Sequence, residues 1–496
     1  MERTFISLSG KFGQSLILLA LLALLFWAYT RNNNFPFYYH TDEPGKVRQI
    51  IDGTRNYRHP LLLVDATDAA VGALQIQKTP QGIVRVGRCI SALAAALAIA
   101  GVVLLTRRHT EWTFALLAGA IAGSHPFLFE ATHYMKEDCV LLAGLIWSLY
   151  GLDCFCDSGS KMSILLCGFA AGVAASGKYL GIVALLFAIG VVVYKGGGWK
   201  RTAGYVGLLG AIFIATFLAI NFRAVVHFSD AINGIGAEFH RINRDRSSAL
   251  FASNYFSRLV VHTGPLLVLS AITYFATFFR ERKKTIEWAL LLFAFVYVTA
   301  LCFTPLAKDR YLIPIVTLFA IFAVLGIRSL AQLFPRLPHF GCAPVVACVV
   351  LIASQLPLTF LEAREFQRDV RREMAQWIRD HLPADAVIAH DPHAWPGADP
   401  LDPKGVVTQR QISPVLFSAE LQNIENMKRL GITHVVVTGH LYRRVVGEGG
   451  QSITPDNAFY KEVETNGVSL WRVPPGRILY LSPGLTVYAL PSAIEN

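Results

Sequence analysis

The chain has 496 residues, of which 53% are hydrophobic and only 16% are charged. This composition excludes an ordinary soluble protein of that length and predicts one that lies largely within a membrane. The formal net charge of +11 does not predict a nucleic-acid partner, because the basic residues lie in short loops and are explained by membrane topology. Membrane lipid with anionic head groups is the partner they favour.

Eleven apolar runs without formal charge follow one another along the chain. Each is close to the length of about 17–25 residues that crosses the hydrocarbon core as a helix. We therefore predict spans at residues 16–30, 89–105, 112–129, 139–152, 162–177, 179–194, 202–222, 263–279, 288–307, 311–327 and 340–361. No clean small-residue cleavage site follows the first run, so we predict a retained anchor.

The basic residues predict the orientation of these spans. Arginines and lysines at residues 107–108, 195–201, 280–284 and 328–336 all fall on the same side as the N-terminus. The positive-inside rule makes that side cytoplasmic. With an odd number of spans, the C-terminus lies on the opposite, outer side.

Charged residues also gather in the loops that this topology places outside. These loops cover residues 31–83, 124–138, 223–262 and 305–310. With the tight turn between the fifth and sixth spans, they contain Asp42-Glu43, His59-Pro60, Glu137-Asp138, Lys178-Tyr179 and Arg310-Tyr311. A lysine at such a turn must reach the membrane surface or an anion.

The composition changes after residue 361. Apolar residues at positions 370, 374, 377 and 378 have helical spacing, and strands are predicted at 386–389, 434–438, 469–473 and 485–490, with a second helix at about 415–430. We predict that residues 1–361 form a transmembrane domain and that residues 362–496 form a small periplasmic α/β domain.

No formal charge lies inside a predicted span, whereas carboxylates and cations gather just outside several spans on one face. Pumps and ion-coupled transporters usually keep some charge near the middle of the membrane. The pattern therefore predicts chemistry at the outer interface. A suitable substrate has an anionic head at the surface and a tail in lipid, as a polyprenyl-phosphate sugar does.

The motifs resemble those of a known superfamily. Asp42-Glu43 and His59-Pro60 in the first outer loop, an acidic pair before the fourth span, Lys178-Tyr179 and a later Arg-Tyr-Leu-x-Pro sequence occur here in one order and on one side. In this the chain resembles the GT-C glycosyltransferases, and more narrowly family 39, which includes protein mannosyltransferases and aminoarabinose transferases. The predicted C-terminal domain is similar to the outer domain of bacterial members.

The resemblance implies an inverting transfer of a sugar from a polyprenyl-phosphate donor, in the inner membrane of a bacterium and at its periplasmic face. Asp42, beside Glu43, is then the catalytic base for the acceptor. Lys178, Arg310 and Tyr311 are expected to bind the donor phosphate, since fixed cations stabilise the charge that grows on this leaving group.

The same resemblance gives His59, Glu137 and Asp138 a role in positioning the acceptor or a divalent cation. Some GT-C enzymes use a metal and others do not, so metal use stays open. The acceptor, whether a protein, a lipid or an envelope glycan, also stays open.

Other interpretations fit the same residues. Asp42-Glu43 suits the start of a helix, His59-Pro60 suits a turn, and Lys178 suits a helix end whose lysine reaches the surface. The alternative function is a transporter or flippase of lipid-linked sugars, in which the outer charges only bind the head group.

Overall fold

A computed structural model gives the structure of the chain. It describes residues 2–37, 39–244, 254–278, 285–302, 309–333, 342–368, 370–390, 394, 412–413, 424–439, 455–478 and 481–491. The chain divides into two compact units. The first comprises Met1–Asn33, Gly45–Lys78 and Gly82–Thr359, and the second comprises Asn34–Pro44, Thr79–Gln81 and Phe360–Asn496. Two short pieces of the predicted first outer loop thus belong to the same unit as the C-terminal residues.

Helices build the described part of the first unit. Three of them, α2, α4 and α17, also contribute a few residues to the second unit. In chain order the helices are α1 (Glu2–Thr30), α2 (Glu43–Ile51), α3 (Leu62–Ala73), α4 (Pro80–Arg107), α5 (Trp112–Gly123), α6 (Pro126–Thr132), α7 (Asp138–Ser158), α8 (Lys161–Gly177), η1 (Tyr179–Gly181), α9 (Ile182–Lys195), α10 (Trp199–Ile220), α11 (Phe222–Val226), α12 (Phe228–Arg244), α13 (Asn254–Thr263), α14 (Pro265–Phe278), α15 (Thr285–Cys302), η2 (Asp309–Leu312), α16 (Ile313–Gln332) and α17 (Ala343–Glu365).

Most of these helices are apolar. In the described part of the chain, seven are long and apolar enough to cross a membrane, namely α1, α4, α7, α10, α15, α16 and α17. The bent pair α5 and α6 makes an eighth if it is one span, and α8, η1 with α9, and α14 are shorter apolar helices. Every predicted span falls on one of these helices. The prediction of a polytopic α-helical membrane protein is confirmed, while the number of eleven crossings stays a prediction.

The third predicted span is not one straight helix, because α5 and α6 are bent by 64°. Between them His125 is extended, and its Nδ1 accepts a hydrogen bond from the N–H of Phe127 at 3.2 Å. Pro126 has no N–H and disfavours a helical conformation in the residue before it. The His125-Pro126 step therefore breaks the helix, which hydropathy alone did not predict.

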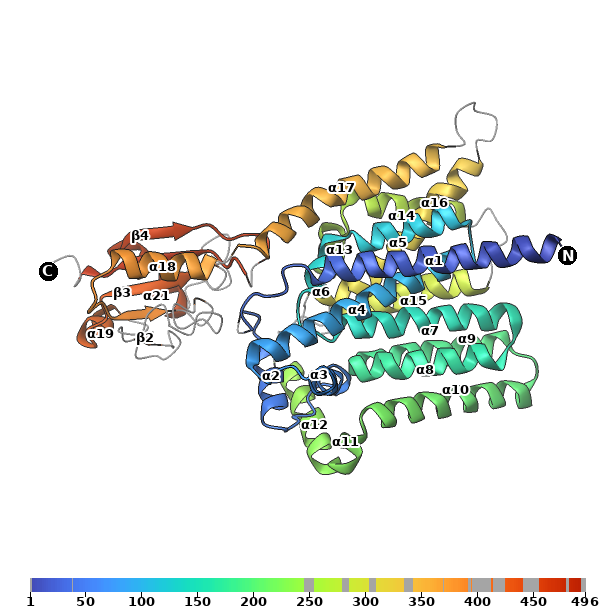
Figure 1. The fold of residues 1–496 in the computed structure, drawn as a ribbon, viewed down its shortest axis with the longest axis horizontal. Helices are drawn as coiled ribbons and strands as arrows, with labels where there is room; N and C mark the ends of the chain where they lie inside the picture. Colours follow the sequence, from blue (N-terminus) through green and yellow to red (C-terminus); the bar gives the residue numbers. More distant parts are fainter. Residues whose placement is uncertain are drawn as a thin grey trace. The chain divides into compact units, whose positions relative to one another are not determined.

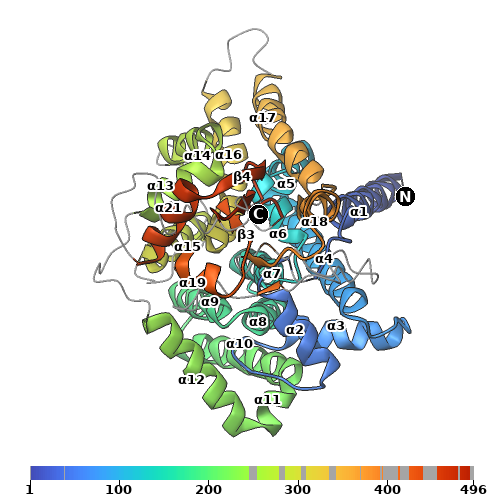
Figure 2. The same cartoon turned by 90° about the vertical axis from the view of Figure 1, so that its left-hand side faces the viewer.

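Small residues bring α7 and α8 close together. A Cβ on Gly144 of α7 would lie 2.4 Å from the backbone N of Ala174 on α8, so only glycine fits there. In Figures 1 and 2, α7, α8 and α10 follow one another side by side. Because α7 and α8 are antiparallel neighbours, the first residue of α7 lies beside the last residues of α8.

The second unit contains a small mixed sheet. Its strands are β1 (Ile388–His390), β2 (Ile412–Ser413), β3 (His434–Thr438), β4 (Val468–Val473) and β5 (Leu485–Ala489). They lie in the order β2-β1-β3-β5-β4, with β1 parallel to β2 and β3 and with β5 antiparallel to β3 and β4. Its helices are α18 (Val370–His381), α19 (Ile424–Arg429) and α21 (Pro455–Asn466).

Apolar side chains on both faces of this sheet form its core. Met374 and Ile378 of α18 pack with Ile388 and Val436, whereas Met427 of α19 packs with residues that include Val435, Tyr460 and Val463. The predicted small C-terminal α/β fold is confirmed. The predicted helix at 415–430 is seen from Ile424 onward, and residues 414–423 lie outside the described part of the chain.

Candidate active site

Two acidic residues begin α7. Glu137 is in the N-cap position and Asp138 is the first helical residue, and both are buried. Negative side chains are favoured at a helix N-terminus. Glu137 makes no side-chain capping hydrogen bond, however. Both carboxylates are instead engaged by cations from other parts of the chain.

Asp138 is paired with two cations. The Nζ atom of Lys178 lies 2.7 Å from its Oδ1, and the Nε atom of Arg310 lies 3.5 Å from its Oδ2. The ring of Tyr311 completes the group, since the Lys178 Nζ lies 4.2 Å from its centroid. Three of the residues expected to bind a donor phosphate therefore meet at the acidic end of α7.

The backbone explains how Lys178 reaches this position. It ends α8 in an extended conformation (φ −151°, ψ 135°), and its carbonyl accepts a hydrogen bond from the N–H of Gly181 at 2.7 Å. A Cβ on Gly181 would lie 2.2 Å from the carbonyl carbon of Ala174, so the turn requires glycine. Arg310 and Tyr311 lie in η2, directly before α16.

Glu137 has a different partner, which the sequence analysis missed. The Nζ atom of Lys46, on α2, lies 2.7 Å from its Oε1 and also donates a hydrogen bond to the carbonyl of Met135 at 2.7 Å. The two side chains are only 6% and 8% exposed. This buried pair fixes α2 against the start of α7, because leaving either charge alone there would be costly.

Lys136, which precedes the acidic pair, is a second cation that the sequence analysis missed. It is 4% exposed, and burial, together with the charge of Arg310, lowers its pKa to about 7. For Glu137, burial acts to raise the pKa, but the charges of Lys46 and Lys136 outweigh it and hold the pKa well below the ordinary value. Near neutral pH the site therefore keeps at least as much positive as negative charge.

The α2–α3 loop (residues 52–61) carries His59. Its imidazole is exposed, and it lies near enough to Glu137, Lys46 and Lys178 for their charges to act on it. Tyr57 in the same loop is buried with an unusual positive φ of 51°, and its carbonyl accepts a hydrogen bond from the hydroxyl of Tyr179 at 3.0 Å. The loop is thus tied to the turn that follows Lys178.

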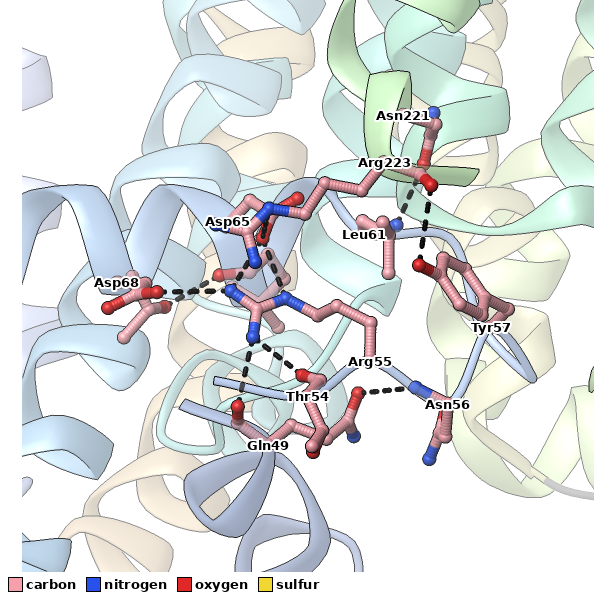
Figure 3. A network of polar contacts seen from close by, with 12 residues as sticks. Gln49, Thr54, Arg55, Asn56, Tyr57, Leu61, Asp65, Asp68, Asn221 and Arg223 are labelled. Atoms are coloured by element: carbon pink, nitrogen blue, oxygen red, sulfur yellow. Dashed lines mark hydrogen bonds and ion pairs between the residues drawn. The ribbon is translucent and has the colours of Figure 1, made fainter. Parts of the chain in front are cut away.

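An ion-pair network holds this loop from the other side (Figure 3). The side chain of Arg55 is 1% exposed and pairs with Asp65 at 2.7 Å and with Asp68 at 3.1 Å, both on α3. Its Nη1 also donates to the carbonyl of Gln49 at 2.9 Å. At the end of the loop, the N–H of Leu61 donates to Oδ1 of Asn221 at 2.8 Å.

Asp42 and Glu43 belong to the second unit. Asp42 is half-buried, and its N–H donates to Nδ1 of His40 at 3.2 Å. Glu43 is fully buried and begins α2. The predicted start of a helix at this pair is therefore seen, and a helix start does not preclude a catalytic carboxylate.

A cation site is not preassembled in the described residues. There, no group of three or more His, Cys, Asp and Glu side chains is placed to hold a metal ion. A divalent cation at Glu137 or Asp138 would have to compete with Lys46, Lys178 or Arg310 for the same oxygens.

Two solved structures have a fold similar to that of this chain. ArnT from Cupriavidus metallidurans, bound to undecaprenyl phosphate, has a TM-score of 0.53 at 13% identity over 96% of this chain and 98% of that one. The archaeal oligosaccharyltransferase AglB from Archaeoglobus fulgidus, in complex with an inhibitory peptide and a dolichol-phosphate, has a TM-score of 0.54 at 12% identity over 88% of this chain and 72% of that one. The chain has the GT-C fold.

The sequence supports the same conclusion. Residues 83–220 match the family model described as dolichyl-phosphate-mannose-protein mannosyltransferase. That stretch contains Glu137, Asp138 and Lys178. No curated protein matches the sequence significantly. The prediction of a GT-C-type glycosyltransferase that resembles family 39 is confirmed at the level of fold and family resemblance.

Proposed function

We propose that this GT-C chain transfers a sugar, with inversion, from a polyprenyl-phosphate donor to an acceptor at the periplasmic face of a bacterial inner membrane. The observation that carries the proposal is the meeting of Lys178 and Arg310 on one carboxylate, Asp138. Two fixed cations that share a single negative charge retain attraction for a further anion. The two similar structures hold undecaprenyl phosphate and a dolichol-phosphate, which is consistent with a lipid phosphate as that anion.

Lys178 and Arg310 act on the leaving group in this proposal. Negative charge grows on the phosphate oxygen as its bond to the anomeric carbon breaks, and cations already in place stabilise it without reorganisation. Asp138 keeps both cations oriented. Tyr311 limits the freedom of the Lys178 ammonium, which lies 4.2 Å from its ring centroid.

Asp42 is the proposed base. Its carboxylate takes the proton from the acceptor hydroxyl or amine as that atom attacks the anomeric carbon, and the polyprenyl phosphate leaves from the opposite face. A single displacement of this kind inverts the configuration. Glu43 is proposed to support Asp42, and His59 and Glu137 are proposed to position the acceptor.

A transfer assay tests this function. Purified protein in lipid receives a radiolabelled pool of polyprenyl-phosphate sugars and total envelope acceptors, for wild type and for Asp42→Asn. We expect label to reach an acceptor with wild type, and transfer to fall at least about a hundredfold in the variant while donor binding persists. Full transfer by Asp42→Asn would reject Asp42 as the base. Label that changes leaflet without transfer would instead support a flippase.

A further inference from the structure

The segment before Asp42 is packed within the second unit. The rings of Phe35 and Phe366 have centroids 5.5 Å apart. The guanidinium carbon of Arg371, on α18, lies 4.0 Å from the centroid of the Tyr39 ring. Tyr39 is 2% exposed and Arg371 is 1% exposed, so this contact is removed from solvent.

An arginine in such a position is unusual. Arg372 and Arg379 of the same helix are exposed, as expected for an amphipathic helix on the surface of a sheet. Arg371 is instead turned inward, on a helix whose Met374 and Ile378 pack in the core of the α/β fold. A buried guanidinium needs compensating partners, and the face of an aromatic ring is one that it binds well.

Hydrogen bonds also hold Phe35, Phe37 and Asp42, on either side of Tyr39. The Oε1 atom of Gln81 accepts a bond from the N–H of Phe37 at 3.1 Å, and its Nε2 donates to the carbonyl of Phe35 at 3.0 Å. The N–H of Asp42 donates to His40, which directly follows Tyr39. Only His40 and Thr41 separate Tyr39 from Asp42, so a displacement of Tyr39 is expected to move Asp42 as well.

We propose that Arg371 is a positioning residue for Asp42. It acts through Tyr39, so that α18 of the C-terminal α/β fold holds the segment that carries the base. The proposal rests on the proposed role of Asp42 in sugar transfer. It makes α18 a part of the structure that positions the catalytic base.

Kinetics of full-length protein in lipid test this proposal. The variants are Arg371→Met, Tyr39→Leu and their combination, with Tyr39→Phe to keep the ring and Arg379→Met as an exposed control on the same helix. We expect Arg371→Met and Tyr39→Leu each to lower kcat about 10–100-fold, with the donor KM within about twofold of wild type. We expect Tyr39→Phe and Arg379→Met to stay near wild type, and the double variant to be no slower than either single variant.

Hydrogen exchange supplies a readout that does not depend on activity. Arg371→Met should increase exchange of the amides of residues 34–44 and leave the strands of the sheet protected. Unchanged exchange, unchanged kcat, or losses that add in the double variant would each overturn the proposal. If Arg371→Met does not fold, Tyr39→Leu answers the same question.

Asp42→Asn, assayed in parallel, separates this inference from the proposed function. An inactive Asp42→Asn beside a fully active Arg371→Met would overturn the positioning role alone. A fully active Asp42→Asn would reject the base, and the positioning role with it.

Discussion

Asp138 brings two cations together at this site. Its two oxygens face different cations, Lys178 at 2.7 Å and Arg310 at 3.5 Å. A carboxylate at a helix start is favoured by the helix dipole in any protein. What distinguishes Asp138 is that it is buried and paired with two partly exposed cations that come from two other helix ends.

The sequence predicted some of the residues of this site and missed others. Lys178 and Arg310 were predicted because each lies at the end of an apolar run, where a charge is conspicuous. Lys46 was missed because it lies in the middle of the long first outer loop, where lysines are common. Lys46 and Ile50 are four residues apart on α2 and both are buried, so they lie on the same face of that helix.

The pKa of Lys136 leads to a prediction about stability. Because burial lowers the pKa to about 7, between pH 7 and the ordinary value the unfolded chain binds more protons than the folded one. The destabilisation that comes from burying the charged Lys136 ammonium is fully present below pH 7. It disappears as the pH rises through the pKa that Lys136 has in the unfolded chain. Lys136→Met should therefore raise the melting temperature at pH 7 by about 1–3 °C, and by less at pH 10. Thermal unfolding at both pH values measures this, and a lower melting temperature at pH 7 would contradict it.

The ion pairs that hold the α2–α3 loop were not predicted from the sequence. Arg55 pairs with Asp65 and Asp68, which lie three residues apart on one face of α3. That spacing can be read from the sequence. The pairing cannot, because it depends on how the loop folds back over the helix.

Removal of Arg55 should loosen this loop. Arg55→Met leaves Asp65 and Asp68 without their main cation. Breaking a fully buried pair costs about 3–5 kcal/mol, and we expect a smaller loss of about 1–3 kcal/mol here because both carboxylates are partly exposed and Asp68 keeps Lys78. We expect faster tryptic cleavage after Arg58, which is exposed in the same loop. Arg48→Met, at an exposed position on α2, is the control. Cleavage at the wild-type rate would show that Arg55 does not hold the loop.

The break between α5 and α6 marks another limit of prediction from sequence. The apolar run at residues 112–129 predicts one continuous helix. The Pro126 ring and the hydrogen bond from Phe127 to His125 determine the bend. Hydropathy measures the apolar content of a segment and carries no information on such local bonds.

For the whole molecule, the sequence predicted the fold class. It did not predict that residues 34–44 and 79–81 group with the C-terminal residues in one compact unit. The eleven apolar runs and the strand pattern after residue 361 were sufficient to predict helices followed by an α/β fold. The packing of residues 34–44 with α18 joins positions far apart in the chain, and no local pattern predicts it.

A second ionisable cluster lies at the opposite end of α7. His109 places Nε2 at 3.2 Å from Asp153 and Nδ1 at 3.7 Å from Glu287, and the other Glu287 oxygen accepts a bond from Tyr274. This cluster joins the α4–α5 loop to α7, α14 and α15. Burial alone would lower the pKa of His109, but the two carboxylates raise it to about 9.

The raised pKa of His109 gives the molecule a pH-dependent stability. The charged His109 stabilises the fold fully below its pKa in the unfolded chain, about 6.5. This stabilisation is lost as the pH rises through its pKa in the folded chain, about 9. We expect His109→Asn to lower the melting temperature at pH 6.5 by about 2–4 °C and to have little effect at pH 10. A difference that does not shrink between these pH values would contradict this role.

The affinity of the protein for undecaprenyl phosphate in lipid nanodiscs tests whether Lys178 and Arg310 bind the donor phosphate. Wild type is compared with Lys178→Met and Arg310→Met, and with Lys161→Met, which removes an exposed cation from the other end of α8. If Lys178 and Arg310 bind the donor phosphate, each substitution weakens binding about tenfold or more, and the Lys161 variant binds as wild type. Equal affinity in all four proteins would show that the phosphate does not bind at these cations.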